Sequence, residues 1–270
     1  MSIRRPAVAG QFYQSSAAGL KRQIEQLIEP AAAKKKAIAC VLPHAGYMYS
    51  GAVAAKTVSG LTIPDTVILL GPNHTGRGAL FSVMAEGSWQ TPLGLVRIDT
   101  QLAAKLLNQS KYLETDTLAH EYEHSLEVEL PLLQYFRPDF QMVPITVSGS
   151  RPEILAQLGR DIAAVIRDND LRDSVLIIAS SDMTHYEPQD QAQEKDRQAI
   201  EAILRLDGAD LLRRVSAYGI SMCGWAPVAI MLSAATALGA TGATLVQYQT
   251  SGDVSGDRSS VVGYAGIILQ

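Results

Sequence analysis

The chain of 270 residues carries 23 basic and 27 acidic side chains, and 47% of its residues are hydrophobic. These values exclude an intrinsically disordered chain, which combines low hydrophobicity with high net charge, and the net charge of −4 excludes binding to nucleic acid through a basic surface. Two cysteines, Cys40 and Cys223, are too few for a disulfide framework or a zinc ribbon.

The first predicted elements alternate between helix and buried strand. Residues 16–29 are expected to form an amphipathic helix, because Leu20, Ile24 and Leu27 share one helical face. Short apolar runs predict strands that are covered on both faces, and these runs span residues 37–42, 66–70, 141–147 and 174–179. Helical patterns lie between these runs, at residues 50–61 and 154–165.

Two segments depart from this alternation and predict antiparallel pairs. Residues 80–99 have the pattern of a β-hairpin, and residues 242–251 and 259–269 are expected to pair with each other. The other strands alternate with helices, which is typical of a parallel sheet. We therefore expect an α/β fold with a single domain over residues 1–270, in which helices cover both faces of a mixed, mostly parallel central sheet.

One long segment, residues 215–252, contains no charged side chain. Gly224, Pro227, Gly239 and Gly242 interrupt it, so a buried helix followed by a strand is predicted rather than a membrane span. The N-terminal residues contain no apolar run of the length found in secretory signals. The expectation is a cytoplasmic protein that has no membrane segment.

Three of the five histidines, His44, His74 and His185, lie a few residues beyond predicted strands. In open α/β sheets, ligands bind beyond the carboxyl ends of the strands. Neutral imidazole is a common metal ligand, so His44 and His74 can form a metal site if their strands are neighbours. Cys223 is the candidate for a third ligand, because a cation stabilises a thiolate. Cys40 lies within an apolar run and is expected to pack in the core.

Residues 120–124 spell HEYEH, which matches the H-E-x-x-H pattern of zinc proteases. That pattern needs one amphipathic helix through both histidines, but the preceding residues are polar and Pro131 interrupts the apolar pattern that follows. We expect instead that a helix starts here, with Ser125 or a neighbour as its cap. His124 and Glu127 are then placed to surround a metal site and to orient its ligands without binding the metal themselves.

Three other motifs are candidate sites for a nucleotide, for calcium or for a cover over a cleft. The glycine-containing residues 70–78 lack the spacing of both dinucleotide and Walker loops, so no nucleotide cofactor is expected. Residues 251–260 lack the spacing of an EF-hand, and a turn between two strands is the simpler prediction. The N-terminal segment RRPAVAGQFY is expected either to cover a cleft with Phe12 and Tyr13 or to pack along the sheet edge.

Several long motifs follow one another along the chain: RRPAVAGQFY, LPHAGYMYSG, LGPNHTG, EHSLEVELPLLQ, SSDMTHYE, MCGWAPV and YQTSGDVSGDRSSVVGYAGI. Together they resemble the Memo family from about residue 4 to the end of the sequence. This family is similar in fold to the class III extradiol ring-cleaving dioxygenases, which hold a non-haem iron on an α/β scaffold. The resemblance therefore implies a dioxygenase-like fold with a metal site.

The resemblance also implies roles for individual residues. His44 of PHAGY and His74 of GPNH look like the two histidine ligands of the dioxygenase-like site, and Cys223 stands where those dioxygenases place a carboxylate ligand. His185 of SSDMTHYE resembles their acid/base residue, with Asp182 beside it as an orienting group. Because a thiolate is softer than a carboxylate and favours copper or zinc, ring cleavage does not follow from the fold alone.

The leading hypothesis is a metal-dependent redox enzyme with a site of two histidines and one cysteine. Fe(II) or copper is favoured, and zinc is the alternative metal. His124, Glu127 and Tyr47 are expected to surround the ligands. The substrate is a small molecule or a peptide that the sequence does not identify, and the resemblance alone implies a pathway shared with a radical SAM protein.

Two other functions stay open. Animal members of the family are described as signalling adaptors that bind phosphotyrosine peptides, and that role would use Tyr47, Tyr49, Tyr186 and Trp225 as walls of the same cleft. The acidic chain has no cluster of arginines suited to phosphate, which argues against this hypothesis. A zinc hydrolase is the third hypothesis, because two histidines and a cysteine leave a coordination position for water.

Overall fold

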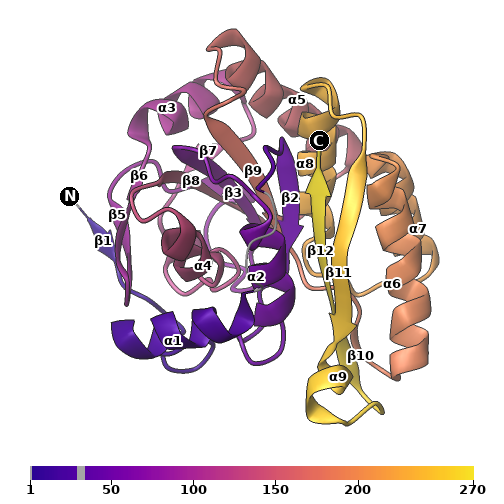
Figure 1. The fold of residues 1–270 in the computed structure, drawn as a ribbon. Helices are drawn as coiled ribbons and strands as arrows, with labels where there is room; N and C mark the ends of the chain where they lie inside the picture. Colours follow the sequence, from indigo (N-terminus) through magenta and orange to yellow (C-terminus); the bar gives the residue numbers. More distant parts are fainter. Residues whose placement is uncertain (1, 29–33) are drawn as a thin grey trace.

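This computed structural model describes residues 2–28 and 34–270. Within these residues, twelve strands form one mixed sheet (Figure 1). The strands are β1 (Ile3–Arg4), β2 (Ala39–Leu42), β3 (Thr66–Pro72), β4 (Phe81–Val83), β5 (Ser88–Thr91), β6 (Gly94–Ile98), β7 (Glu114–Thr115), β8 (Gln141–Val147), β9 (Val175–Ser180), β10 (His185–Glu187), β11 (Ala243–Thr250) and β12 (Val261–Leu269). The helices are α1 (Ala17–Leu27), α2 (Gly51–Ser59), α3 (Thr100–Gln109), α4 (Glu129–Phe136), α5 (Pro152–Asp168), α6 (Gln189–Leu204), α7 (Gly208–Ala217), α8 (Trp225–Ala237) and α9 (Ser251–Ser255), with a short 3₁₀ turn η1 (Leu118–His120).

Five parallel strands form the centre of the sheet, in the order β6-β8-β3-β9-β2. Antiparallel strands extend this centre on both sides: β5 pairs with β6, and β12 pairs with β2, β11 and β10. Strand β1 adds to the outer edge of β5. The predicted mixed, mostly parallel sheet is confirmed.

Helices pack on both faces of the sheet because neighbouring strand residues point to opposite sides (Figure 1). On one face, Val41 and Ile68 belong to an apolar cluster that includes Leu158 of α5 and the buried residues of α8. On the other face, Cys40 belongs to a second cluster with residues of α2 and α4. Cys40 is fully buried in this cluster, which agrees with its expected packing role.

The predicted elements match the structure with two local differences. Helix α1 begins after Ser16, whose side chain accepts the N–H of Gly19, and the predicted end of this helix at residue 29 lies outside the described residues. The hairpin predicted over residues 80–99 contains only β5 and β6, since β4 pairs with β7 and β8 instead. The second pair, β11 with β12, is antiparallel as predicted, and α9 occupies part of the expected turn.

The uncharged segment, residues 215–252, forms the buried helix α8 and then strand β11, as predicted. Eight of the first ten residues of α8 are apolar and buried on nearly every side, which explains why this helix has no polar face. Within the described ranges, we find no helix that combines the length and the apolar character needed to cross a bilayer.

Candidate metal site

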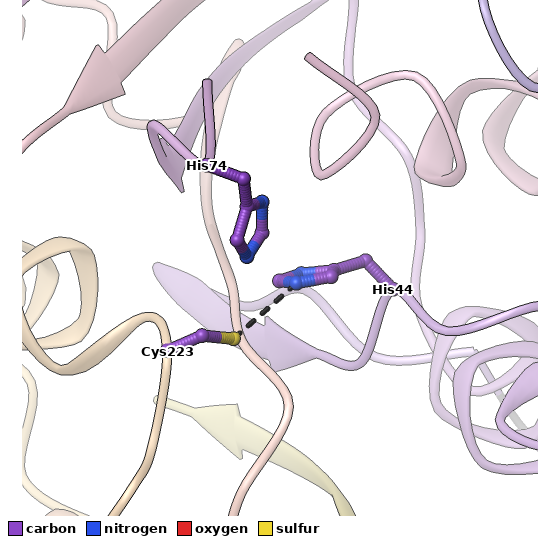
Figure 2. A group of neighbouring side chains, drawn as sticks. All are labelled: His44, His74 and Cys223. Atoms are coloured by element: carbon purple, nitrogen blue, oxygen red, sulfur yellow. Dashed lines mark hydrogen bonds between the residues drawn. The ribbon is translucent and has the colours of Figure 1, made fainter. Parts of the chain in front are cut away.

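Two imidazoles and a thiol meet where loops converge beyond the carboxyl ends of the central strands (Figure 2). His44 follows β2, His74 follows β3, and Cys223 precedes α8. One nitrogen of each ring and the Cys223 sulfur all lie within 4.8 Å of one another, and His44 Nε2 is 3.3 Å from Cys223 Sγ. The structure therefore brings together the three side chains that the sequence indicates as metal ligands.

Glu123 orients the His74 ring. Its carboxylate lies 2.9 Å from His74 Nδ1, accepts the backbone N–H of His74 at 2.5 Å, and accepts the N–H of Ser125 at 2.8 Å. Burial opposes the charge on Glu123, but these contacts outweigh it and lower the pKa of the carboxyl to about 2. The charged carboxylate therefore accepts a hydrogen bond from the Nδ1–H of His74, which leaves the Nε2 lone pair for a ligand.

Asp182 connects the two other ligands. Its side chain accepts the backbone N–H of His44 at 2.9 Å, and its own N–H lies 3.3 Å from Cys223 Sγ. Burial raises the pKa of the Asp182 carboxyl to about 6. Burial also raises the pKa of the Cys223 thiol, and Asp182 adds to that shift. A cation beside the sulfur would be needed to hold it as a thiolate.

His185 lies beside this group without joining it. Its Nδ1 is 2.9 Å from the carbonyl oxygen of Ser221, and its backbone N–H donates to the Ser221 hydroxyl at 2.8 Å. Because a carbonyl only accepts, Nδ1 carries the proton and Nε2 has a free lone pair. Burial lowers the pKa of the His44 ring well below its ordinary value, and the neighbouring imidazoles of His124, His74 and His185 add to that shift.

Comparison with known proteins agrees with this arrangement of motifs. The family model for the Memo-like protein matches residues 4–268. The chain belongs to the Memo family. A MEMO1 family protein of Methanothermobacter thermautotrophicus is 46% identical over an alignment that covers 97% of this chain and 99% of that protein, and one from Aquifex aeolicus is 43% identical over the whole of both chains.

The fold of this Memo family member also occurs in a distant solved structure. The crystal structure of an uncharacterized protein from Escherichia coli K12 matches it with a TM-score of 0.57, over 85% of this chain and 98% of that one. The two sequences are 14% identical, so this likeness shows a shared fold alone.

The residues expected behind the ligands take different places in this Memo family protein. His124 stacks on His74, with ring centroids 4.6 Å apart, and its centroid is 5.6 Å from that of His44. Glu127 instead binds the N-terminal segment, and the buried Tyr47 donates its hydroxyl to the carbonyl of Val128 at 2.8 Å. The hydrogen bonds that Glu127 and Tyr47 make among the described residues therefore go to partners other than the three candidate ligands, and a supporting role for these two side chains stays a prediction.

Sequence reasoning missed Glu123, the acid that does support His74. It lies in the HEYEH run, where four acidic or histidine side chains follow each other without a regular period. The adjacent glutamate and histidine at 123 and 124 were a signal of metal chemistry, but nothing in the pattern indicates which acid turns inward.

The HEYEH segment is irregular, which excludes the helical zinc-protease motif. Only the short turn η1 reaches His120, and a helix begins later, at Glu129. The expected cap was also wrong: Ser125 donates its hydroxyl to the carbonyl of Pro72 at 3.0 Å, and α4 has no side-chain cap. Pro131 causes no break because it lies in the first turn of α4, where a backbone N–H has no helical partner.

His120 is expected to make stability depend on acid pH. It is fully buried against Trp89, and burial lowers its pKa from 6.5 to about 4. Because the folded-state pKa lies below the unfolded one, the neutral imidazole stabilises the fold above pH 6.5, and this contribution, about 3 kcal/mol, is lost as the pH falls toward 4. Urea denaturation across this pH range should show a shallower loss of stability for His120→Leu, and an unchanged slope would contradict the prediction.

Gly224 holds the Cys223 loop close to strand β9. A Cβ at this position would lie 2.4 Å from the Ser180 carbonyl oxygen and 2.4 Å from Ser181 Cβ. We expect Gly224→Ala to lower the free energy of unfolding by about 1–3 kcal/mol and to weaken metal binding, because the loop that carries Cys223 must move. Gly242→Ala is the matched control, since no atom of the described residues, apart from its chain neighbours, lies within 4 Å of its Cβ position. Equal effects of the two changes on metal affinity would count against this role.

The N-terminal segment both extends the sheet edge and reaches the site. Strand β1 pairs with β5, as one of the two expectations stated. The ring of Phe12 lies 5.0 Å from that of His124, so the segment also covers one side of the histidine cluster. Tyr13 is buried and donates its hydroxyl to Glu127 at 2.6 Å, which excludes it as a mobile lid.

Proposed function

We propose that this Memo family protein is a metal-dependent redox enzyme in which His44, His74 and Cys223 hold the metal. The observation that carries the proposal is the convergence of two imidazole nitrogens and one sulfur within 4.8 Å of one another. Three protein ligands are typical of catalytic metal sites, because further coordination positions then stay open for substrate.

The residues present fit a transition metal. Neutral imidazole and thiolate are donors that suit copper, iron and zinc, whereas calcium and magnesium prefer oxygen. The Glu123 carboxylate bound to His74 Nδ1 is the outer support that metal-binding histidines commonly have. An iron or copper ion bound here would supply electron transfer between a reduced substrate and an oxidant such as dioxygen.

The protein itself supplies proton transfer and orientation. His185 presents a free Nε2, since its Nδ1 proton is held by the Ser221 carbonyl, and it is the group proposed to take or give a proton. Asp182 holds the His44 loop and the Cys223 loop together through its contacts with both. The proposed substrate is a small molecule or peptide that enters beside these residues, and the proposed location is the cytoplasm.

The geometry favours this function over a peptide-binding adaptor. An adaptor would use Tyr47 as a cleft wall, but Tyr47 is 1% exposed and packs against Tyr13. Arg4 is buried against Glu127 and is therefore not available to bind phosphate. A zinc hydrolase would use the same three ligands, so the identity of the bound metal distinguishes it from a redox enzyme.

Purification without oxygen, reconstitution and elemental analysis test the proposal. We expect one equivalent of iron or copper in the wild type, none in His44→Ala, and oxygen consumption with catechols or thiols by the loaded wild type. His185→Asn is the companion variant: it should bind metal like the wild type but consume oxygen about 100-fold more slowly. A wild type that binds no metal, or a His44→Ala protein that binds it equally, would contradict the metal site, and exclusive zinc without redox activity would favour a hydrolase.

A further inference from the structure

A buried serine links the ligand His44 to a glutamate that no part of the proposed function uses. Ser180 Oγ lies 2.8 Å from His44 Nδ1, 2.7 Å from the carbonyl oxygen of Ser125 and 2.8 Å from Glu129 Oε1. Ser180 and Glu129 are both fully buried. The chain of contacts therefore runs from the first residue of α4, through the end of β9, to the metal-site loop after β2.

The number of available protons restricts how these three contacts can form. A serine hydroxyl has one hydrogen and two lone pairs, and a carbonyl oxygen can only accept. Ser180 must therefore give its single hydrogen to Ser125, because two oxygens 2.7 Å apart with no hydrogen between them repel. In the other two contacts Ser180 must then be the acceptor and its partner the donor. His44 must therefore carry a hydrogen on Nδ1, and Glu129 must carry one on Oε1.

The surroundings of Glu129 support a neutral carboxyl. Its second oxygen, Oε2, is buried and has no hydrogen-bond partner among the described residues. A neutral carbonyl oxygen tolerates such a place far better than a carboxylate, because a buried anion without a partner loses its hydration uncompensated. The start of α4 favours an anion only weakly by comparison. Burial raises the pKa of Glu129 well above its ordinary value, and the charge of Asp182 adds to that shift.

We propose that Glu129 is a neutral carboxylic acid that, through Ser180, fixes His44 in the tautomer with hydrogen on Nδ1 and a free lone pair on Nε2. Glu129 and Ser180 are positioning residues, because they act on the site only through His44. The Nε2 lone pair then faces Cys223 Sγ, 3.3 Å away, where the proposed metal would bind. The role of this lone pair in metal binding rests on the proposed function, whereas the protonation states of Glu129 and His44 do not depend on it.

This arrangement makes the two histidines unequal. His74 donates to a charged carboxylate, which increases the electron density on its Nε2, whereas His44 donates to a neutral hydroxyl. If Glu129 were ionised, Ser180 would turn its hydrogen toward the carboxylate, and the Ser125 contact would lose its proton. The neutral acid therefore keeps the single Ser180 hydrogen on the Ser125 carbonyl, so that one Ser180 lone pair accepts from Glu129 and the other accepts from His44 Nδ1.

Spectra of the metal-free protein test the protonation states directly. Infrared difference spectra of wild type against Glu129→Gln near neutral pH should show the carbonyl stretch of one buried carboxylic acid that is lost in the variant. Nitrogen-15 NMR of labelled histidine should show His44 with a protonated Nδ1 and an unprotonated Nε2. A carboxylate band lost in Glu129→Gln, or a protonated His44 Nε2 in the wild type, would overturn the inference.

Variants then test the positioning role. Glu129→Gln keeps a donor for Ser180, so the His44 tautomer should stay unchanged and metal affinity should stay within about twofold. Ser180→Ala removes the acceptor for His44 Nδ1, and we expect a mixture of tautomers with metal affinity lower by about 10-fold to 100-fold. An unchanged tautomer in Ser180→Ala would overturn this role. Failure of the wild type to bind metal would overturn the proposed function but would leave the spectroscopic result intact.

Discussion

Replacing Cys223 with alanine is expected to abolish tight binding of copper, iron or zinc. The sulfur is the only anionic donor among the three proposed ligands, and its loss leaves two neutral imidazoles to hold a cation. Removal of an outer-shell partner alone costs 10-fold to 100-fold in metal affinity, so we expect a loss of more than about 100-fold here. Competition against a chelator of known affinity measures this loss, and circular dichroism checks that the fold is retained.

Cys40→Ala is the matched control for this prediction. Cys40 is fully buried in the apolar cluster between the sheet and helices α2 and α4. Its replacement should lower stability by about 1 kcal/mol through lost packing while metal affinity is unchanged. Equal affinities for the two variants would show that Cys223 is not a ligand.

Arg4→Met is expected to cause a large loss of stability. The Arg4 guanidinium forms a buried ion pair with Glu127 at 2.5 Å, donates to the carbonyl oxygens of His120 and Glu123, and lies 4.1 Å from the ring centre of Trp89. Methionine removes the positive charge and leaves Glu127 as a buried anion without its counter-ion. Such a break typically costs about 3–5 kcal/mol, which urea denaturation would detect as a lower unfolding midpoint.

An exposed ion pair provides the comparison. Arg77 pairs with Glu121 at 3.0 Å, but both side chains are more than 40% exposed, so Arg77→Met should change stability by less than about 1 kcal/mol. Adding Glu127→Gln to Arg4→Met should recover part of the loss, because the buried negative charge is then removed. If Glu127→Gln instead lowered the stability of Arg4→Met again by as much as Arg4→Met lowered that of the wild type, an uncompensated charge would not be the cause of the loss.

The candidate ligands were predictable because the strand-end rule depends only on local patterns. Runs of apolar residues indicate the strands, and the loops that follow them carry His44 and His74. The order of the strands was not predictable in the same way. Strand β9 lies between β2 and β3, so the two histidines come from strands that are not adjacent, and the loops span the intervening strand. Cys223 required the family motif, since no strand ends just before it.

The acids behind the ligands could not be assigned from the sequence. Glu123, Glu127 and Glu129 follow each other at a spacing of two or four residues, and all three are fully buried. They contact three different partners: His74, Arg4 and Ser180, respectively. The residues from 121 to 128 form bends, irregular backbone and a turn with no regular period, so neither a helical nor an extended pattern indicates where each carboxyl points.

The position of β12 in the sheet has a consequence for synthesis. This strand follows all the others in the chain, yet it pairs with β2, whose end leads to His44. While the ribosome adds residues from the N-terminus onward, one edge of β2 therefore stays unpaired until residues 261–269 emerge. An open strand edge is prone to pair with another chain, so the nascent protein passes through a stage that favours chaperone binding.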